Sequence, residues 1–292
     1  MLLMKRLKAN LNYKNKCHPR GKWQVIFVVI VVLACFSYFE NNAVVISNYS
    51  IKSDRLPKSF NNFKIVQVSD LHNKVFYKDN KSLVSKIKSQ KPDIIVITGD
   101  LVDRRKYNED NALSFIDKIK SIAPIYYVNG NHEGLSGKFE SLEKKLEERG
   151  VKVLRNESID YVKGKEKIII SGVDDPSFNT SGYSEDIINK ELLSKDDEKN
   201  FRILLSHRPE LFDLYVNNNV DVAFAGHAHG GQVIIPFLGG VVAPNQGFRP
   251  KYYKGMYTEN NTTMVVSRGL GNSIFPQRLF NRPEIVTVTL NY

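Results

Sequence analysis

Five short polar motifs, each directly after an apolar run, hold most of the residues that could do chemistry in this chain. In chain order they are Asp70-Leu71-His72, Gly99-Asp100-Leu101-Val102-Asp103, Gly130-Asn131-His132-Glu133, Ser206-His207 and Gly226-His227-Ala228-His229. Five of the six histidines fall within them. Taken singly, each motif is an ordinary turn at the end of a strand. Taken together, buried polar groups of this density need partners, and metal ions would supply them.

The types of side chain in these motifs restrict the metal. Carboxylates, imidazoles and an amide oxygen without sulfur favour Mn, Fe, Zn or Co over Ca and over a thiolate-rich structural zinc site. Seven candidate ligands in these motifs are too many for one ion and suit two ions that share a carboxylate. Two metals roughly 3.5 to 4 Å apart are a recurrent arrangement for phosphoryl transfer. The motifs therefore predict a dinuclear centre.

The elements around the motifs predict an α/β domain. Short runs rich in Val, Ile and Phe predict buried strands at 63–70, 92–100, 123–131, 166–175, 201–207 and 221–227. Helical patterns separate several of them, at 80–90, 108–120, 138–149 and 209–217. This alternation predicts a largely parallel sheet, whose strand ends converge on one crevice. The last third alternates without helices at 232–236, 263–267 and 285–290, which predicts a second, more antiparallel sheet.

The N-terminal region predicts a membrane anchor. The formal net charge is +11, but much of the excess precedes Trp23, where no acidic residue occurs: Lys5, Arg6, Lys8, Lys14, Lys16, Arg20 and Lys22. No nucleic-acid-binding face is therefore expected. The apolar run Trp23–Phe39 would span about 25 Å as a helix, the low end for crossing a bilayer. Its basic flank predicts a cytoplasmic N-terminus and a catalytic domain on the outer side.

Alternatives to this anchor remain open. A cleaved signal peptide has a similar pattern, and Val31-Val32-Leu33-Ala34-Cys35 resembles a lipobox, in which Cys35 would carry the lipid. A buried core helix is a third interpretation. The expected organisation is a basic cytoplasmic tail (1–22), a transmembrane signal anchor (23–39), a linker with room for one edge strand (40–62) and the catalytic domain (63–292). Both cysteines, Cys17 and Cys35, lie outside that domain, so no disulfide or thiol serves it.

The ordered motifs D-x-H, G-D-x-x-D, G-N-H-E, H and G-H-x-H resemble the calcineurin-like metallophosphoesterase family over residues 63–292. The resemblance implies a four-layer αββα sandwich of two mixed sheets with two divalent metal ions at the sheet edges. It implies that one metal is bound by Asp70, His72 and His229, the other by Asn131, His207 and His227, and both by Asp100. It also implies that His132 stands near the leaving group without binding metal, and that Asp103 supports the ligands from outside.

The expected reaction is hydrolysis of a phosphodiester or pyrophosphate bond. Metal coordination lowers the pKa of water, which would attack phosphorus in line while His132 assists the departing oxygen. Asp-Leu-His, Gly-Asp-Leu-Val-Asp-Arg, Ala-Pro-Asn-Gln-Gly and Ser-Arg-Gly-Leu-Gly-Asn are similar to a membrane-associated bacterial branch related to UDP-2,3-diacylglucosamine pyrophosphatases, which implies a lipid-linked substrate. Residues 234–257 are either a plain hairpin or a lip for a lipidic group. An exported phosphodiesterase for nucleotides or wall polymers, and a non-catalytic metal-binding platform, are the alternatives.

Overall fold

The computed structural model describes residues 19–178, 200–272 and 275–292. The chain divides into two units between Phe39 and Glu40. Among the described residues, one helix, α2 (Pro19–Asn42), is long and apolar enough to cross a membrane by length and composition. Its apolar side chains, such as Val28 and Leu33, are exposed. Residues 1–18 of the predicted basic tail, with Cys17, lie outside the described residues.

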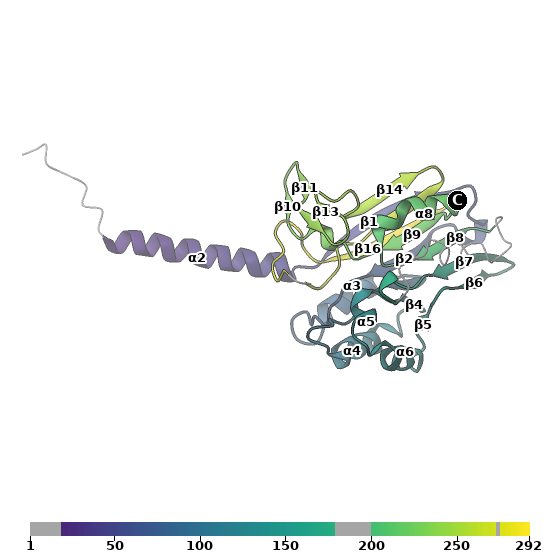
Figure 1. Ribbon diagram of the computed structural model, residues 1–292, viewed down its shortest axis with the longest axis horizontal. Coiled ribbons are helices and arrows are strands. Elements are labelled where there is room, and N and C mark those ends of the chain that lie inside the picture. Colours follow the sequence, from purple (N-terminus) through teal and green to yellow (C-terminus); the bar gives the residue numbers. More distant parts are fainter. Residues whose placement is uncertain (1–18, 179–199, 273–274) are drawn as a thin grey trace, which may run out of the picture. The chain divides into compact units, whose positions relative to one another are not determined.

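The first of two six-stranded sheets in the second unit contains the strands that precede three of the motifs (Figure 1). Its strands β2 to β5 are parallel to one another, β16 is antiparallel to β2, and β1 is parallel to β16. In spatial order they are β1 (Val45–Lys52), β16 (Glu284–Asn291), β2 (Phe63–Val68), β3 (Ile94–Thr98), β4 (Ile125–Val128) and β5 (Lys152–Val153).

The second sheet contains the strands that precede the other two motifs. It is parallel inside and antiparallel at both edges. In spatial order its strands are β14 (Gly255–Glu259), β15 (Thr262–Val266), β9 (Val222–Ala225), β8 (Arg202–Leu205), β7 (Glu166–Gly172) and β6 (Glu157–Lys163). Both sheets are therefore mixed, as predicted.

The last third does not form a separate antiparallel sheet, which corrects the expectation from its pattern. Strand β15 joins the second sheet parallel to β9, and β16 joins the first sheet. Residues 232–236 contain only β10 (Ile234–Ile235), which pairs with β11 (Gly239–Gly240); β12 (Val242–Ala243) and β13 (Gly247–Phe248) form another short pair. Alternation of apolar and polar residues indicates that a segment is a strand. Packing with residues distant in sequence decides which strand it pairs with.

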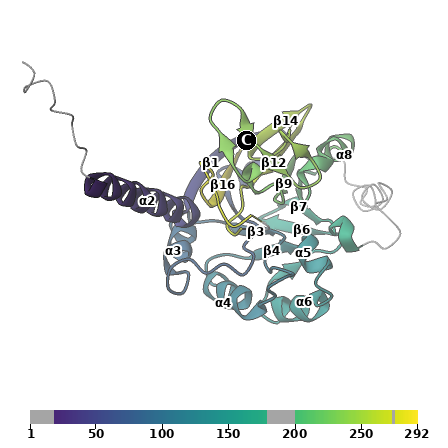
Figure 2. The ribbon, with the colours of Figure 1, turned by 60° about the vertical axis from the view of Figure 1, so that its left-hand side comes forward.

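Three apolar cores separate four layers, in the order helix, sheet, sheet, helix (Figure 2). Helices α3 (Lys81–Ser89), α4 (Glu109–Ile119) and α6 (Phe139–Glu147) pack on the first sheet through side chains that include Phe115. The two sheets pack on each other through a core that includes Ile65 and Ile168. Helix α8 (Phe212–Asn217) covers the second sheet through Phe212 and Met264. This confirms the predicted αββα sandwich.

The shorter helical segments lie in the connections. They are α5 (Asn131–Gly134) and the 3-10 turns η1 (Lys58–Phe60), η2 (Pro176–Phe178), η3 (Pro209–Leu211) and η4 (His229–Gly231). The segment predicted as a linker, 40–62, contains β1 and η1, and Glu40 is buried. This segment has few apolar side chains, but Leu56 and Phe60 enter the core between the sheets and attach it to the domain.

Candidate metal centre

The five motifs lie at the C-terminal ends of β2, β3, β4, β8 and β9, where the two packed sheets bring them together. Among the described residues, three groups of histidines and carboxylates have donor atoms within 4.8 Å of one another. The groups are Asp70, His72, Asp100 and His229; Asp100, His207 and His227; and His72, Asp103 and His132. Residues 157 positions apart, such as His72 and His229, are thus neighbours.

One oxygen of Asp100 lies between two sets of histidines. Its Oδ2 atom is 3.6 Å from His72 Nε2 and 3.3 Å from His207 Nε2. Its other oxygen, Oδ1, accepts a hydrogen bond from the backbone N–H of His132 at 2.8 Å. The carboxylate is therefore held at one oxygen while the other faces both sets, as a bridging ligand would.

The first set consists of Asp70, His72 and His229. The Nε2 atoms of His72 and His229 are 3.1 Å apart, and His229 Nε2 is 3.4 Å from Asp70 Oδ1. Asp70 accepts hydrogen bonds from Ser69 Oγ at 2.6 Å and from the backbone N–H of His227 at 3.1 Å. Among the described residues, the buried Nδ1 atoms of His72 and His229 have no hydrogen-bond partner. Two imidazole nitrogens that face each other this closely suit a shared cation.

The second set consists of Asn131, His207 and His227. It also brings lone-pair atoms of buried side chains close together. His207 Nδ1 donates to the carbonyl oxygen of Thr98 at 2.7 Å, so Nε2 carries the lone pair in the neutral ring and faces Asp100 Oδ2. His227 Nδ1 lies 3.1 Å from His207 Nε2. The buried Oδ1 atom of Asn131 has no hydrogen-bond partner among the described residues. A cation or a proton must separate the facing acceptors, so these side chains fit a divalent metal.

The pKa shifts agree with this interpretation. Burial lowers the pKa of His72 to about 4 and that of His227 to about 3, so both are neutral, the form that binds metal. Burial also opposes charge on His207, but Asp100 and Asp70 outweigh it and raise the pKa of His207 to about 10. Asp100 and Asp70 therefore favour a proton on His207, which a bound metal would displace.

Five of the predicted ligands have a strained backbone conformation. Several non-glycine residues adopt the left-handed region, with φ of 51° at Asp70, 48° at His72, 51° at Asp100, 65° at His227 and 47° at His229. Asp and His tolerate this region better than most residues, but such strain costs of order 1–3 kcal/mol per residue and persists where function requires it. Its presence at five predicted ligands supports a functional site.

Two motif glycines make room for the carboxylates. A Cβ atom at Gly130 would lie 2.3 Å from Asp100 Oδ1, and one at Gly226 would lie 2.0 Å from Ser69 Oγ and 2.6 Å from Asp70 Oδ2. Any larger residue at either position would displace a predicted ligand or the serine that holds it.

His132 and Asp103 lie beside the first set. The backbone N–H of Arg104 donates to His132 Nδ1 at 3.1 Å, so the proton of the neutral ring is on Nε2. The His132 ring packs edge-on against His72, with centroids 4.5 Å apart. Asp103 is 4.0 Å from the nearest ring nitrogen of each histidine, beyond hydrogen-bond range. Burial lowers the pKa of His132, against the opposing charges of Asp100 and Asp103.

Glu133 connects two of the ligand loops, a role that the sequence reasoning did not assign. It is fully buried and accepts hydrogen bonds from the backbone N–H groups of Asp100, Gly130 and Val102, at 2.9, 2.8 and 3.1 Å. Burial and the Asp100 charge raise its pKa to about 7. The sequence feature that points to Glu133 is its position as the last residue of the G-N-H-E motif.

Arg208 and Asn245 hold the outer side of the second set and were also missed. Asn245 Oδ1 and Arg208 Nη1 each lie 2.9 Å from His227 Nε2. Arg208 Nη1 donates to Asn245 Oδ1 at 2.6 Å, and Arg208 Nη2 donates to the buried Asp175 at 2.9 Å. Asn245 belongs to the quoted Ala-Pro-Asn-Gln-Gly stretch, and Arg208 directly follows a ligand, but neither pattern indicates this contact by itself.

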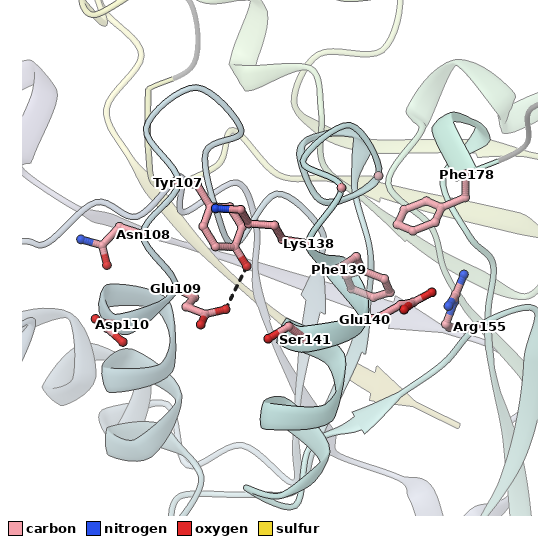
Figure 3. Close-up of a pocket in the computed structure, with 12 residues that line it drawn as sticks. Tyr107, Asn108, Glu109, Asp110, Lys138, Phe139, Glu140, Ser141, Arg155 and Phe178 are labelled. Carbon is pink, nitrogen blue, oxygen red and sulfur yellow. Dashed lines mark hydrogen bonds between the residues drawn. The ribbon is translucent and has the colours of Figure 1, made fainter.

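A cavity of about 930 Å³ adjoins helix α5, which carries Asn131 and His132 (Figure 3). Gly134 is on its wall, but none of the predicted ligands line it. Tyr107 donates to Glu109 at 3.0 Å, and Lys138 Nζ lies 4.7 Å from the centre of the Tyr107 ring. The wall thus combines aromatic rings with both signs of charge, next to the helix of the predicted leaving-group histidine.

Comparisons with known proteins agree with this geometry. Residues 63–231 match the model of the calcineurin-like phosphoesterase family. The chain is 31% identical over 259 residues to the uncharacterized metallophosphoesterase YkuE of Bacillus subtilis (strain 168), with 87% of each chain covered. It is 25% identical to a Danio rerio transmembrane protein with metallophosphoesterase domain, covering 91% of this chain and 62% of that one.

A solved structure shares the fold. The match to TT1561 of Thermus thermophilus has a TM-score of 0.50 at 13% identity, and it covers 71% of this chain and 90% of that one. The extent of the family match and the identity to YkuE together settle the classification. The chain belongs to the calcineurin-like phosphoesterase family, whose members are metal-dependent phosphoric ester hydrolases with a centre of two divalent metal ions.

Proposed function

We propose that this chain is a membrane-attached phosphodiesterase or pyrophosphatase that acts on a lipid-linked substrate. The observation that carries the chemistry is the position of Asp100 Oδ2, 3.6 Å from His72 Nε2 and 3.3 Å from His207 Nε2. When bound, the two metal ions supply Lewis acidity: they lower the pKa of water and stabilise negative charge on phosphate oxygens.

The residue roles follow from the two sets. Asp70, His72 and His229 hold one metal, and Asn131, His207 and His227 hold the other, with Asp100 shared. The close donor atoms of the histidines and carboxylates support this division, as does the unpartnered buried Oδ1 of Asn131. Asp103 orders the loop beside the first set, since its Oδ1 accepts the backbone N–H of Arg105 at 2.7 Å.

His132 is proposed to assist the leaving oxygen by donating a hydrogen bond to it. The Arg104 N–H fixes its Nδ1 as an acceptor, so the ring is neutral with its N–H at Nε2, and this N–H can stabilise the charge that develops on a leaving oxygen. Its backbone N–H holds Asp100 Oδ1, which ties the donor to the bridging ligand.

Elemental analysis and hydrolysis of bis-p-nitrophenyl phosphate test the chemistry. The purified full-length chain should contain two metal ions, lose activity with a chelator and recover it with one or more of Mn, Fe, Zn and Co. Metal binding without hydrolysis of any phosphoester would support the alternative, a non-catalytic platform. Activity that survives complete metal removal would contradict the proposal.

The lipid linkage rests on separate observations. Helix α2 is apolar, and a relative that covers most of this chain is named as a transmembrane protein. Exposed apolar side chains after the last ligand include Phe237 and Phe248, which supports a lip for a lipidic group. A screen of lipid extracts against nucleotides and wall polymers, read out by phosphate-containing products, separates this substrate from that of an exported nucleotide or wall-polymer phosphodiesterase.

The proposed topology places the catalytic domain on the outer side of the membrane. Protease added to intact cells should then remove the domain, because the basic residues before Trp23 retain the N-terminus inside. Digestion only after lysis would reverse the orientation. Mass spectrometry of the N-terminus distinguishes an intact anchor from a chain that begins with a lipidated Cys35.

A further inference from the structure

The first residues of the second unit, Glu40 and Asn41, are packed onto it. Glu40 directly follows the apolar run 23–39, is 6% exposed, and its Oε2 accepts the backbone N–H of Asn281 at 3.1 Å. Asn41 donates from Nδ2 to Gln277 Oε1 at 2.8 Å and accepts at Oδ1 from the backbone N–H of Arg278 at 3.1 Å. Residues 40 and 41 are therefore held on residues 277–281 of the second unit, and they follow the apolar run 23–39 directly in the sequence.

Two other loops meet the domain surface at the same place. Lys74 Nζ donates to the carbonyl oxygen of Asn41, which brings loop 73–79 to it. The backbone N–H of Ile234 donates to the carbonyl oxygen of Leu279 at 3.0 Å, which brings in the β10–β11 hairpin. Loops 73–79 and 275–281 thus contact residues 40 and 41, and the β10–β11 hairpin is bound to the second of these loops.

Exposed apolar side chains gather on these three loops, and we call them the apolar collar. Its members and exposed fractions are Val75 (39%), Tyr77 (59%), Ile235 (42%), Phe237 (107%), Leu238 (63%) and Phe275 (50%). Phe237 also has a φ of 69°, a region that bulky residues rarely adopt. Core packing cannot explain a strained, fully exposed phenylalanine. Apolar groups gathered in this way mark a contact surface.

We propose that the apolar collar lies in the interfacial layer of a lipid bilayer, so that the catalytic domain rests on the membrane. The inference rests on the proposed membrane attachment and adds a second contact to it. A bilayer is favoured over a protein partner because residues 40–42, around which the collar is built, are the direct continuation of the apolar run. Aromatic side chains such as Tyr77 are also common at this depth.

Asn281 connects the residues at the base of the apolar collar to the metal centre. Asn281 donates its backbone N–H to Glu40, and its Nδ2 donates to the carbonyl oxygens of His229 at 2.7 Å and Gln232 at 3.0 Å. One residue thus joins Glu40, which directly follows the apolar run in the sequence, to the loop of a predicted ligand. The centre lies near the membrane surface, where the phosphate of a lipid headgroup is found.

Tryptophan quenching in lipid nanodiscs tests the contact with the full-length chain. The sequence contains one tryptophan, Trp23, so Trp23→Phe gives a background in which Phe237→Trp is the only reporter. Its emission should shift to shorter wavelength and lose intensity when lipids brominated near the top of the acyl chain are used. Val162→Trp is the matched control, because Val162 is 64% exposed on β6, which lies at the other edge of the second sheet from β14 (Figure 1).

Equal emission loss for the two reporters, or none for the collar reporter, would overturn the proposal. A blue-shifted but unquenched collar reporter would also overturn it, because that result indicates a protein contact such as a second copy of the chain. If Phe237→Trp lost metal or activity on bis-p-nitrophenyl phosphate, Phe275→Trp would serve as the reporter. The measurement does not require hydrolysis, so failure of the collar and failure of the proposed chemistry are seen separately.

Discussion

The two proposed ligand sets would share Asp100, but the protein supports their histidines differently. In the second set, His207 Nδ1 is held by the Thr98 carbonyl at 2.7 Å and His227 Nε2 by Asn245 at 2.9 Å. In the first set, the Nδ1 atoms of His72 and His229 have no hydrogen-bond partner among the described residues. The first set is instead fixed through its carboxylate, Asp70, which accepts from Ser69 at 2.6 Å.

This difference matters because hydrogen bonds to the outer nitrogen of a ligating histidine orient the ring and raise its basicity. Loss of such a contact typically reduces metal affinity by about 10- to 100-fold. We therefore expect the metal held by His207, His227 and Asn131 to bind more tightly, and the metal held by Asp70, His72 and His229 to leave first during chelation. Stepwise loss of metal, followed by elemental analysis, measures the order.

The largest expected effect comes from the ligand that both sets share. Asp100→Asn removes the negative charge from the oxygen that faces His72 and His207, so both metals should be depleted and hydrolysis should fall to near the detection limit. Elemental analysis of the purified variant is the measurement.

His72→Ala is the matched control for Asp100→Asn, since it alters one set alone and should deplete one metal. If Asp100→Asn retained two metals per chain, the bridging role of Asp100 would be wrong. If His72→Ala depleted both metals equally, the two sets would not bind their metals independently.

His132→Ala should cause the next largest loss of activity. It tests whether a residue packed against the first set acts in the reaction without binding metal. A donor to the leaving oxygen matters most for a poor leaving group, so activity on an alkyl phosphodiester should fall by roughly 10²- to 10⁴-fold. The p-nitrophenyl ester should lose much less, and both metals should remain. Equal losses on the two substrates would assign His132 to holding the phosphate, and loss of metal would make it a ligand.

The resemblance of the ordered motifs to a known family implied the αββα class, and buried strands followed by polar turns predicted that the motifs meet, because such strands leave a local signal. Asp70, His72, Asp100, His207, His227 and His229 come together as expected. The pairing of β16 and the contacts of Arg208 and Asn245 were not predictable in this way. They depend on residues distant in sequence, such as Asn245 against His227, and neither residue type indicates its partner.

Asn245→Ala tests the support of the second set directly. It removes the oxygen that accepts from His227 Nε2, and Arg208 Nη1 loses the same partner. The affinity of one metal should fall by about 10- to 100-fold, while the other metal is retained. Competition with a chelator gives both affinities. Equal weakening of both metals, or no change in either, would contradict the proposed asymmetry.

Asp103→Asn should have the smallest effect. The Asp103 carboxylate is 4.0 Å from the Nδ1 atoms of both His72 and His132, too far for a hydrogen bond. Its oxygen Oδ1 accepts the backbone N–H groups of Arg105 and Lys106 at 2.7 and 3.2 Å, and an asparagine oxygen can accept them as well. The first-set metal should therefore lose less than about tenfold in affinity, below the range for a histidine that loses a direct outer partner. A loss as large as that of Asn245→Ala would show that Asp103 supports His72 as strongly as Asn245 supports His227, and the two sets would then be equivalent.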